Sequence, residues 1–167
     1  DSSTSRGLGD VYKRQEYDRI HKANPNVALK PHYLYDTNVV ILTLFPGIQE
    51  NMIRNILHTP GLRAVVLKTY GSGNAPQKPW FIDLLKEATD RGIVIINISQ
   101  CSTGSVEMGR YETGLHLLDA GVISGYDSTV ESVLTKLMFL LGHGKNESEI
   151  RHQMSIPVAG EFTIPTM

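Results

Sequence analysis

The stretch Ala64–Ser99, "AVVLKTYGSGNAPQKPWFIDLLKEATDRGIVIINIS", decides the fold. Each end is a mainly apolar run rich in β-branched residues, which is typical of a strand buried on both faces. Between them, apolar residues recur at helical spacing after Pro79, a good first-turn residue, and stop before Gly92, a good helix end. A strand, a glycine-rich turn, a helix and a strand in this order predict a unit with two parallel strands.

The same alternation continues towards the N-terminus of the chain. The run "NVVILTLF", residues 38–45, predicts another strand buried on both faces. Residues 48–59 predict a helix with an apolar stripe that includes Ile48, Met52, Ile53 and Ile56.

The alternation also continues towards the C-terminus. We expect helices over 110–121, 128–142 and 147–154, and a short strand at 122–124. Ser128, with Glu131 three positions later, predicts a capping box at the start of the second helix. The predicted fold class is α/β, with a small parallel sheet of about four strands flanked by helices, similar to flavodoxin or Rossmann folds.

The size and charge of the chain narrow the classes of partner. Its 167 residues suffice for one domain, and 16 Lys and Arg balance 17 Asp and Glu to a net charge of −1. This balance predicts neither a nucleic-acid partner nor an anionic membrane. The single cysteine, Cys101, excludes an intrachain disulfide and fits a reducing compartment.

The turn "GSGNAP", Gly71–Pro76, begins like a dinucleotide-binding fingerprint. Pro76 replaces the third glycine, however, and the next strand carries no acidic residue at its end, so dinucleotide binding is disfavoured. Two interpretations remain. The glycines serve a plain turn that needs positive φ, or the turn presents Asn74, whose amide carries a donor and an acceptor suited to recognising another amide.

A second polar segment, "SQCSTGS", follows the strand that ends near Ser99. Cys101 in this segment is predicted to be a small buried hydrophobic residue, with a ligand-contacting thiol as the alternative. His116 lies nearby on a helix, where a surface or half-buried position is favoured over a catalytic one. The six histidines show no metal-ligand spacing, so neither a metal nor another cofactor is predicted.

Three acidic residues, Glu107, Glu112 and Asp127, lie near expected strand ends. They could receive an ammonium group, but we interpret each as a solvated charge or a helix cap. Composition and spacing alone therefore indicate no catalytic pair.

Three blocks together resemble one family: "VVLKTYGSGNAP", "DRGIVIINISQCSTGSVEMGRYETG" and "DAGVISGYDSTVESVLTKLMFLL". They are similar to the C-terminal domain of bacterial L-asparaginases of the cytoplasmic type I branch. The family hydrolyses the side-chain amide of L-asparagine to L-aspartate and ammonia. Its threonine nucleophiles lie in T-G-G-T and T-D-T motifs of an N-terminal domain, and neither motif occurs in this sequence. The resemblance therefore implies no catalytic residue here and a chain that is inactive alone.

The resemblance does imply binding residues. Asn74 matches the position that reaches into the substrate site of a neighbouring subunit, with Ser72 and Gly73 beside it, so a homodimer or homotetramer is expected. Lys68 and Cys101 match positions near a regulatory asparagine site. Many relatives carry arginine in place of Lys68, and lysine lacks the bidentate carboxylate binding of arginine.

The resemblance also suggests a domain plan. Residues 1–15 resemble adapter-derived sequence and are interpreted as a non-native leader. Residues 16–37 would be a linker from a missing N-terminal domain, residues 38–160 the asparaginase C-terminal domain, and residues 161–167 a tail. The alternatives are a glutaminase-asparaginase, an asparaginase-like subunit of a tRNA-dependent amidotransferase, and a free-standing amino-acid-binding module.

Overall fold

The computed structural model describes residues 22–108 and 112–164, without the side chains of residues 112 and 113. The chain divides into two compact units, residues 1–32 and 33–167. In the first unit the described residues form a turn, in which the Val27 N–H donates to the Asn24 carbonyl over 3.1 Å. The predicted leader, residues 1–15, lies outside the described residues, and the predicted domain boundaries stay predictions.

The second unit is built on a four-stranded parallel sheet with the order β1-β2-β3-β4. Its register pairs Leu67 of β2 with Leu42 of β1 and with Asn97 of β3. The strands are β1 Val39–Thr43, β2 Ala64–Thr69, β3 Val94–Ser99 and β4 Ile123–Ser124.

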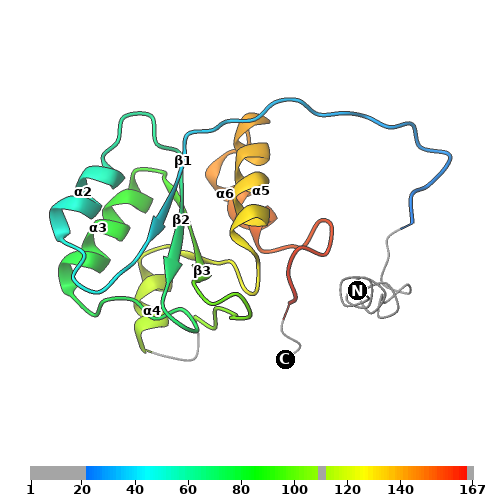
Figure 1. Ribbon diagram of the computed structural model, residues 1–167. Coiled ribbons are helices and arrows are strands. Elements are labelled where there is room, and N and C mark those ends of the chain that lie inside the picture. Colours follow the sequence, from blue (N-terminus) through cyan, green and yellow to red (C-terminus); the bar gives the residue numbers. More distant parts are fainter. Residues whose placement is uncertain (1–21, 109–111, 165–167) are drawn as a thin grey trace, which may run out of the picture. The chain divides into compact units, whose positions relative to one another are not determined.

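Five helices cover the two faces of this sheet in the described part of the chain (Figure 1). The first three connect successive strands, and their buried residues share one core with Val65, Leu67 and Ile95. The last two share a second core with Ala64, Val66 and Ile96. The helices are α2 Glu50–Leu57, α3 Pro79–Asp90 and α4 Glu112–Asp119 on the first face, and α5 Val130–Gly142 and α6 Glu147–Met154 on the second.

This arrangement confirms the predicted fold class and adds a strand order that the sequence pattern did not specify. Right-handed crossovers that always step in the same direction place their helices on one face of the sheet. The sheet order has no reversal, whereas flavodoxin and Rossmann sheets reverse direction at a switch point. The opposite face is therefore covered only by the two helices that follow β4.

Two predictions about the first strand and helix are wrong. β1 is not buried on both faces, because it is an edge strand, and Ile41 is 43% exposed. In α2 the buried side chains are Ile53 and Leu57, while Met52 is 47% exposed. The buried stripe is shifted by one residue from the predicted one, and apolar residues at both positions made the sequence pattern ambiguous.

The predicted start of α5 is also wrong. Its N-cap is Thr129 rather than Ser128, and the Thr129 hydroxyl accepts the Ser132 N–H over 3.2 Å. A complete capping box occurs instead at α6, where Asn146 and Glu149 each accept the backbone N–H of the other. By contrast, the predicted buried face of α3 is confirmed.

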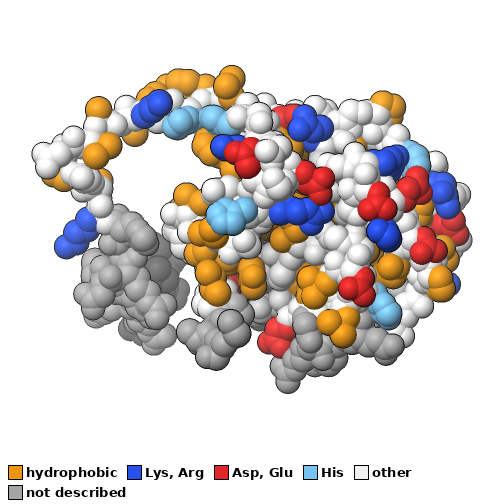
Figure 2. Space-filling view, turned by 180° about the vertical axis from the view of Figure 1, so that it is seen from behind, with side chains coloured by type: hydrophobic (Ala, Val, Ile, Leu, Met, Phe, Trp, Pro, Cys, Tyr) orange, Lys and Arg blue, Asp and Glu red, His pale blue; other side chains and the backbone are white. Residues whose placement is uncertain are grey.

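None of the described helices has both the length and the apolar character needed to cross a membrane. On the face shown in Figure 2, acidic and basic side chains are interspersed over the described residues rather than gathered into a patch of one sign.

Candidate functional site

The turn that follows β2, Tyr70–Asn74, is closed by its own backbone. The Tyr70 carbonyl accepts the N–H groups of Gly73 over 3.0 Å and of Asn74 over 2.8 Å, and the Tyr70 N–H donates to the Asn74 carbonyl over 2.8 Å. Gly71 and Gly73 have φ values of 49° and 110°. The backbone conformation that closes the turn therefore favours glycine at both positions.

The turn leaves the Asn74 side chain exposed, whereas Ser72 is half-buried and Gly73 is buried. Among the described residues, no hydrogen bond engages the side-chain amide of Asn74. Asn74 is thus a polar group with donors and an acceptor available, held on a backbone that is itself fixed.

Residues after β3 hold the turn from one side. The Ser99 hydroxyl donates to the Gly71 carbonyl over 2.6 Å and accepts the Cys101 N–H over 2.9 Å. The Gln100 N–H donates to the Thr69 carbonyl over 2.9 Å. The carboxyl ends of β2 and β3 therefore form one hydrogen-bonded edge, as a parallel sheet predicts.

A buried polar pair lies beneath this edge. The Thr69 hydroxyl donates to Asn97 Oδ1 over 2.6 Å, and both residues are fully buried. A Cβ on Gly73 would lie 3.5 Å from Asn97 Nδ2, and this nitrogen lacks a hydrogen-bond partner within the described residues. Sequence reasoning missed this pair, although the polar Asn97 within the apolar run "IVIINIS" was a usable signal.

The two predicted effector-binding residues lie along the same edge. Lys68 is half-buried on β2, and its carbonyl accepts the Leu44 N–H over 3.0 Å and Gln100 Nε2 over 3.0 Å. Cys101 is exposed, so the prediction that it is a buried hydrophobic residue is wrong. Cys101 belongs to the turn after β3 instead of to the strand, and a turn at the sheet edge has no element covering it.

Two hollows adjoin the start of α3. One, of about 470 Å³, is lined by residues 45–50 with Tyr70, Pro76, Lys78 and Trp80. The other, of about 410 Å³, is lined by residues 76–79 with Ile82, Asp83 and His116. Neither hollow includes Asn74, so the exposed amide of the turn does not face an enclosed site formed by these residues.

Three other acidic or histidine positions complete the account of the sequence candidates. Asp127 accepts the Thr163 N–H over 2.7 Å, and Glu107 donates its backbone N–H to the Ser72 carbonyl over 3.2 Å. His116 is an exposed residue of α4. In the described part of the chain, no three His, Cys, Asp or Glu side chains gather as metal ligands would.

The fold and the turn together define a parallel α/β domain that presents an amide-bearing loop at the carboxyl edge of its sheet. Residues 38–154 match the Glutaminase/Asparaginase C-terminal domain family, and the chain belongs to this family. The predicted family and fold are thereby confirmed.

Individual relatives agree with this assignment. The chain is 46% identical over 132 residues to L-asparaginase 1 of Escherichia coli K12, a match that covers 79% of this chain and 39% of the relative. It is 37% identical over 128 residues to L-asparaginase of Thermococcus kodakarensis, covering 77% of this chain and 38% of the relative. A glutamyl-tRNA(Gln) amidotransferase of Methanobrevibacter smithii also matches, at 33% identity over 168 residues, with 92% of this chain and 38% of the relative covered. The chain thus spans well under half the length of these relatives.

A solved structure matches the fold as well. The crystal structure of L-asparaginase I from Vibrio cholerae superposes with a TM-score of 0.78 at 41% identity. The match covers 84% of this chain and 42% of that one.

Proposed function

We propose that this chain supplies the C-terminal domain of an L-asparaginase, which hydrolyses the side-chain amide of L-asparagine to L-aspartate and ammonia. The observation that carries the proposal is the Asn74 side-chain amide, exposed and without a hydrogen bond among the described residues, on a turn closed by its own backbone. An amide held in this way can orient a substrate amide without making or breaking bonds. Ser72 and Gly73 would shape the same contact.

In this proposal the chain is inactive alone and acts with the threonine-bearing N-terminal domain of its family. Asn74 would complete the substrate site of a neighbouring subunit in a homodimer or homotetramer. The absence of Asn74 from both neighbouring hollows supports a site completed by another chain. A cytoplasmic location accords with the single cysteine.

A regulatory asparagine site near Lys68 and Cys101 is a second part of the proposal. Support comes from their shared position at the carboxyl edge, where Lys68 is half-buried and Cys101 is exposed. A lysine at this place would bind a carboxylate as a point charge rather than as a bidentate fork.

A chimera tests the main proposal. Residues 33–167 of this chain would replace the matching segment of E. coli L-asparaginase 1, and ammonia release from L-asparagine would be measured. Asn74→Ala is expected to lower kcat/KM about 100-fold through loss of substrate orientation, with the thermal midpoint unchanged. The exposed Asn55 of α2 offers the matched control, and Asn55→Ala should leave the activity unchanged.

Unchanged kinetics in Asn74→Ala would contradict the role proposed for Asn74. Assays of the chimera with glutamine, and with charged tRNA plus an amidotransferase partner protein, would separate the asparaginase from the two related enzymes. Calorimetry of this chain with L-asparagine would test the binding-module alternative, because only that alternative expects tight binding without the N-terminal domain.

A further inference from the structure

Tyr126, just after β4, adopts a backbone conformation that non-glycine residues rarely hold. Its φ is 53°, the only positive φ found outside glycine in the described residues. Its N–H donates to Ser124 Oγ over 3.1 Å, and its carbonyl accepts the Val106 N–H over 2.9 Å. Such a conformation persists when surrounding contacts hold it, and it often marks a functional region.

Contacts lead from Tyr126 to the turn that carries Asn74. Ser124 Oγ donates to the Val106 carbonyl over 3.1 Å, so the 124–126 segment holds the backbone of Val106 at both its N–H and its carbonyl. The Val106 side chain is buried, and its Cγ1 lies 3.0 Å from where a Cβ on Gly73 would stand. The next residue, Glu107, donates its N–H to the Ser72 carbonyl.

A C-terminal segment, residues 156–163, which we call the strap, holds Tyr126 from the other side. The rings of Phe162 and Tyr126 are stacked, with centroids 5.1 Å apart and an interplanar angle of 9°. Phe162 is buried, and the Thr163 N–H donates to Asp127 Oδ1. Burial alone would raise the pKa of Asp127, but the hydrogen bonds from the Thr163 backbone and hydroxyl lower it overall.

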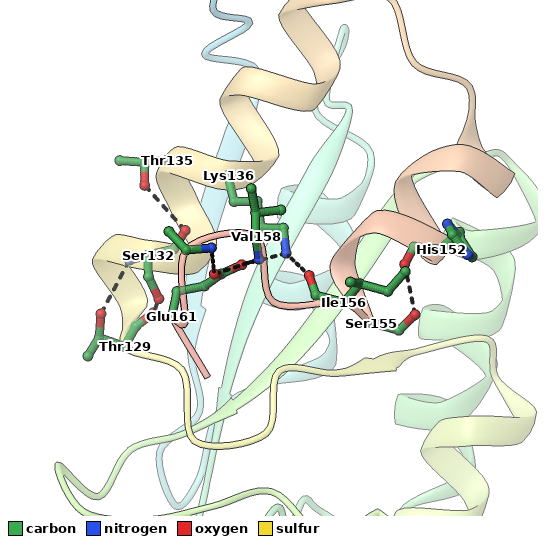
Figure 3. A network of polar contacts seen from close by, with 10 residues as sticks. Thr129, Ser132, Thr135, Lys136, His152, Ser155, Ile156, Val158 and Glu161 are labelled. Atoms are coloured by element: carbon green, nitrogen blue, oxygen red, sulfur yellow. Dashed lines mark hydrogen bonds and ion pairs between the residues drawn. The ribbon is translucent and has the colours of Figure 1, made fainter. Parts of the chain in front are cut away.

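The strap is itself anchored to α5. Lys136 Nζ donates to the Ile156 carbonyl over 2.6 Å and to Glu161 Oε1 over 2.6 Å, and it lies 5.2 Å from the centroid of the Phe162 ring. Figure 3 shows Glu161 enclosed between Lys136 and the backbone of Val158, whose N–H donates to the carboxylate. The strap is therefore a fixed part of the domain rather than a loose end.

We propose that the stack of Phe162 on Tyr126 positions the Asn74 turn, through the backbone of Val106 and Glu107. Tyr126 and Phe162 act as positioning residues, since neither belongs to the turn itself. The inference deepens the proposed function, on which it rests for the ligand that Asn74 meets. Because each link is a contact between packed or hydrogen-bonded groups, the path has a physical basis that can be broken one link at a time.

Hydrogen exchange of backbone amides, measured by NMR on this chain without ligand, tests the proposal. Phe162→Ala should raise exchange at Gly73, Asn74 and Glu107 roughly threefold to tenfold more than at the sheet amides of Leu67 and Ile96, as the loss of one aromatic pair predicts. Tyr126→Phe keeps the stacked ring and should leave exchange in the turn unchanged.

Ile150→Ala, a truncation of a buried residue of α6, is the control for general destabilisation. It should raise exchange in α6 and in the sheet without singling out the turn. If Phe162→Ala does not fold, Asp127→Ala keeps the stack, removes the acceptor for Thr163, and should raise exchange at the same turn amides to a smaller extent.

An equal rise at all amides, or a turn unaffected by Phe162→Ala, would overturn the proposal. A rise in Tyr126→Phe equal to that in Phe162→Ala would also overturn it, because the stack would then not be what matters. Since no ligand is used, these results stand whether or not Asn74 binds asparagine in the chimera.

Discussion

The Asn74 turn and the strap both lie outside the helices and the four-stranded sheet, yet different interactions hold them. The turn is closed by three hydrogen bonds between Tyr70 and residues only three or four positions away. The strap is held by a charged pair and a ring stack that join residues 25 and 36 positions apart. Local backbone geometry therefore fixes one segment, and long-range side-chain contacts fix the other.

The difference also shows in burial. The Lys136 and Glu161 side chains are only 10% and 15% exposed, whereas the Lys86 and Asp90 pair on α3 is 57% and 64% exposed. A pair shielded from water interacts more strongly, but each member depends on the other for compensation. The strap should thus be sensitive to single charge changes that the turn tolerates.

Removing the charge that anchors the strap should have the largest effect. Lys136→Met leaves the Glu161 carboxylate shielded without its partner and should lower the free energy of unfolding by about 3 kcal/mol. Lys86→Met, which removes the exposed ion pair, should cost less than about 0.5 kcal/mol. Urea unfolding of both variants measures this difference, and equal costs would mean that the Lys136 pair does not hold the strap.

A change in the backbone freedom of the turn should have the next largest effect. Gly73→Ala forces an alanine to a φ of 110°, with its Cβ 3.0 Å from Val106 Cγ1. We expect a loss of about 2 kcal/mol.

The matched control lies in the same turn. Gly71 has a φ of 49° and open space where a Cβ would stand, so Gly71→Ala should cost only about 1 kcal/mol. Denaturant unfolding of the two variants gives the comparison. If Gly71→Ala costs as much as Gly73→Ala, contact with Val106 is not what restricts the turn.

The smallest effect is expected for the neutral replacement Glu161→Gln, and it should depend on pH. Burial alone would raise the pKa of Glu161, but the hydrogen bonds from Lys136 and from the N–H groups of Ala159 and Val158 lower it from 4.5 to about 2. The stabilisation by the carboxylate is thus complete above pH 4.5 and is lost as the pH falls towards about 2.

Near neutral pH the Glu161→Gln variant should be less stable by about 1.5 kcal/mol, the scale of a hydrogen bond to a charged group. Unfolding of the wild type and the variant across the acid range should show this difference shrinking as Glu161 becomes protonated. A difference that is constant down to about pH 2 would show that the charge of Glu161 does not hold the strap.

The same contrast explains which sequence predictions succeeded. Pro79 and Gly92 marked the ends of α3, and its buried face was predicted correctly, because helix ends and apolar spacing are local signals. The turn was found for the same reason, since its glycines and Asn74 follow one another in the sequence. Ile41 was misjudged because its exposure depends on β1 lying at the edge of the sheet.

The sequence by itself determined the alternation of strands and helices, the family and the turn that presents Asn74. These features depend on residue spacing and on motifs confined to short segments. Only the tertiary structure decided the strand order, the buried pair of Thr69 and Asn97, and the stack of Phe162 on Tyr126. Such contacts join residues 28 and 36 positions apart, and no local periodicity specifies which distant side chains the folded sheet brings together.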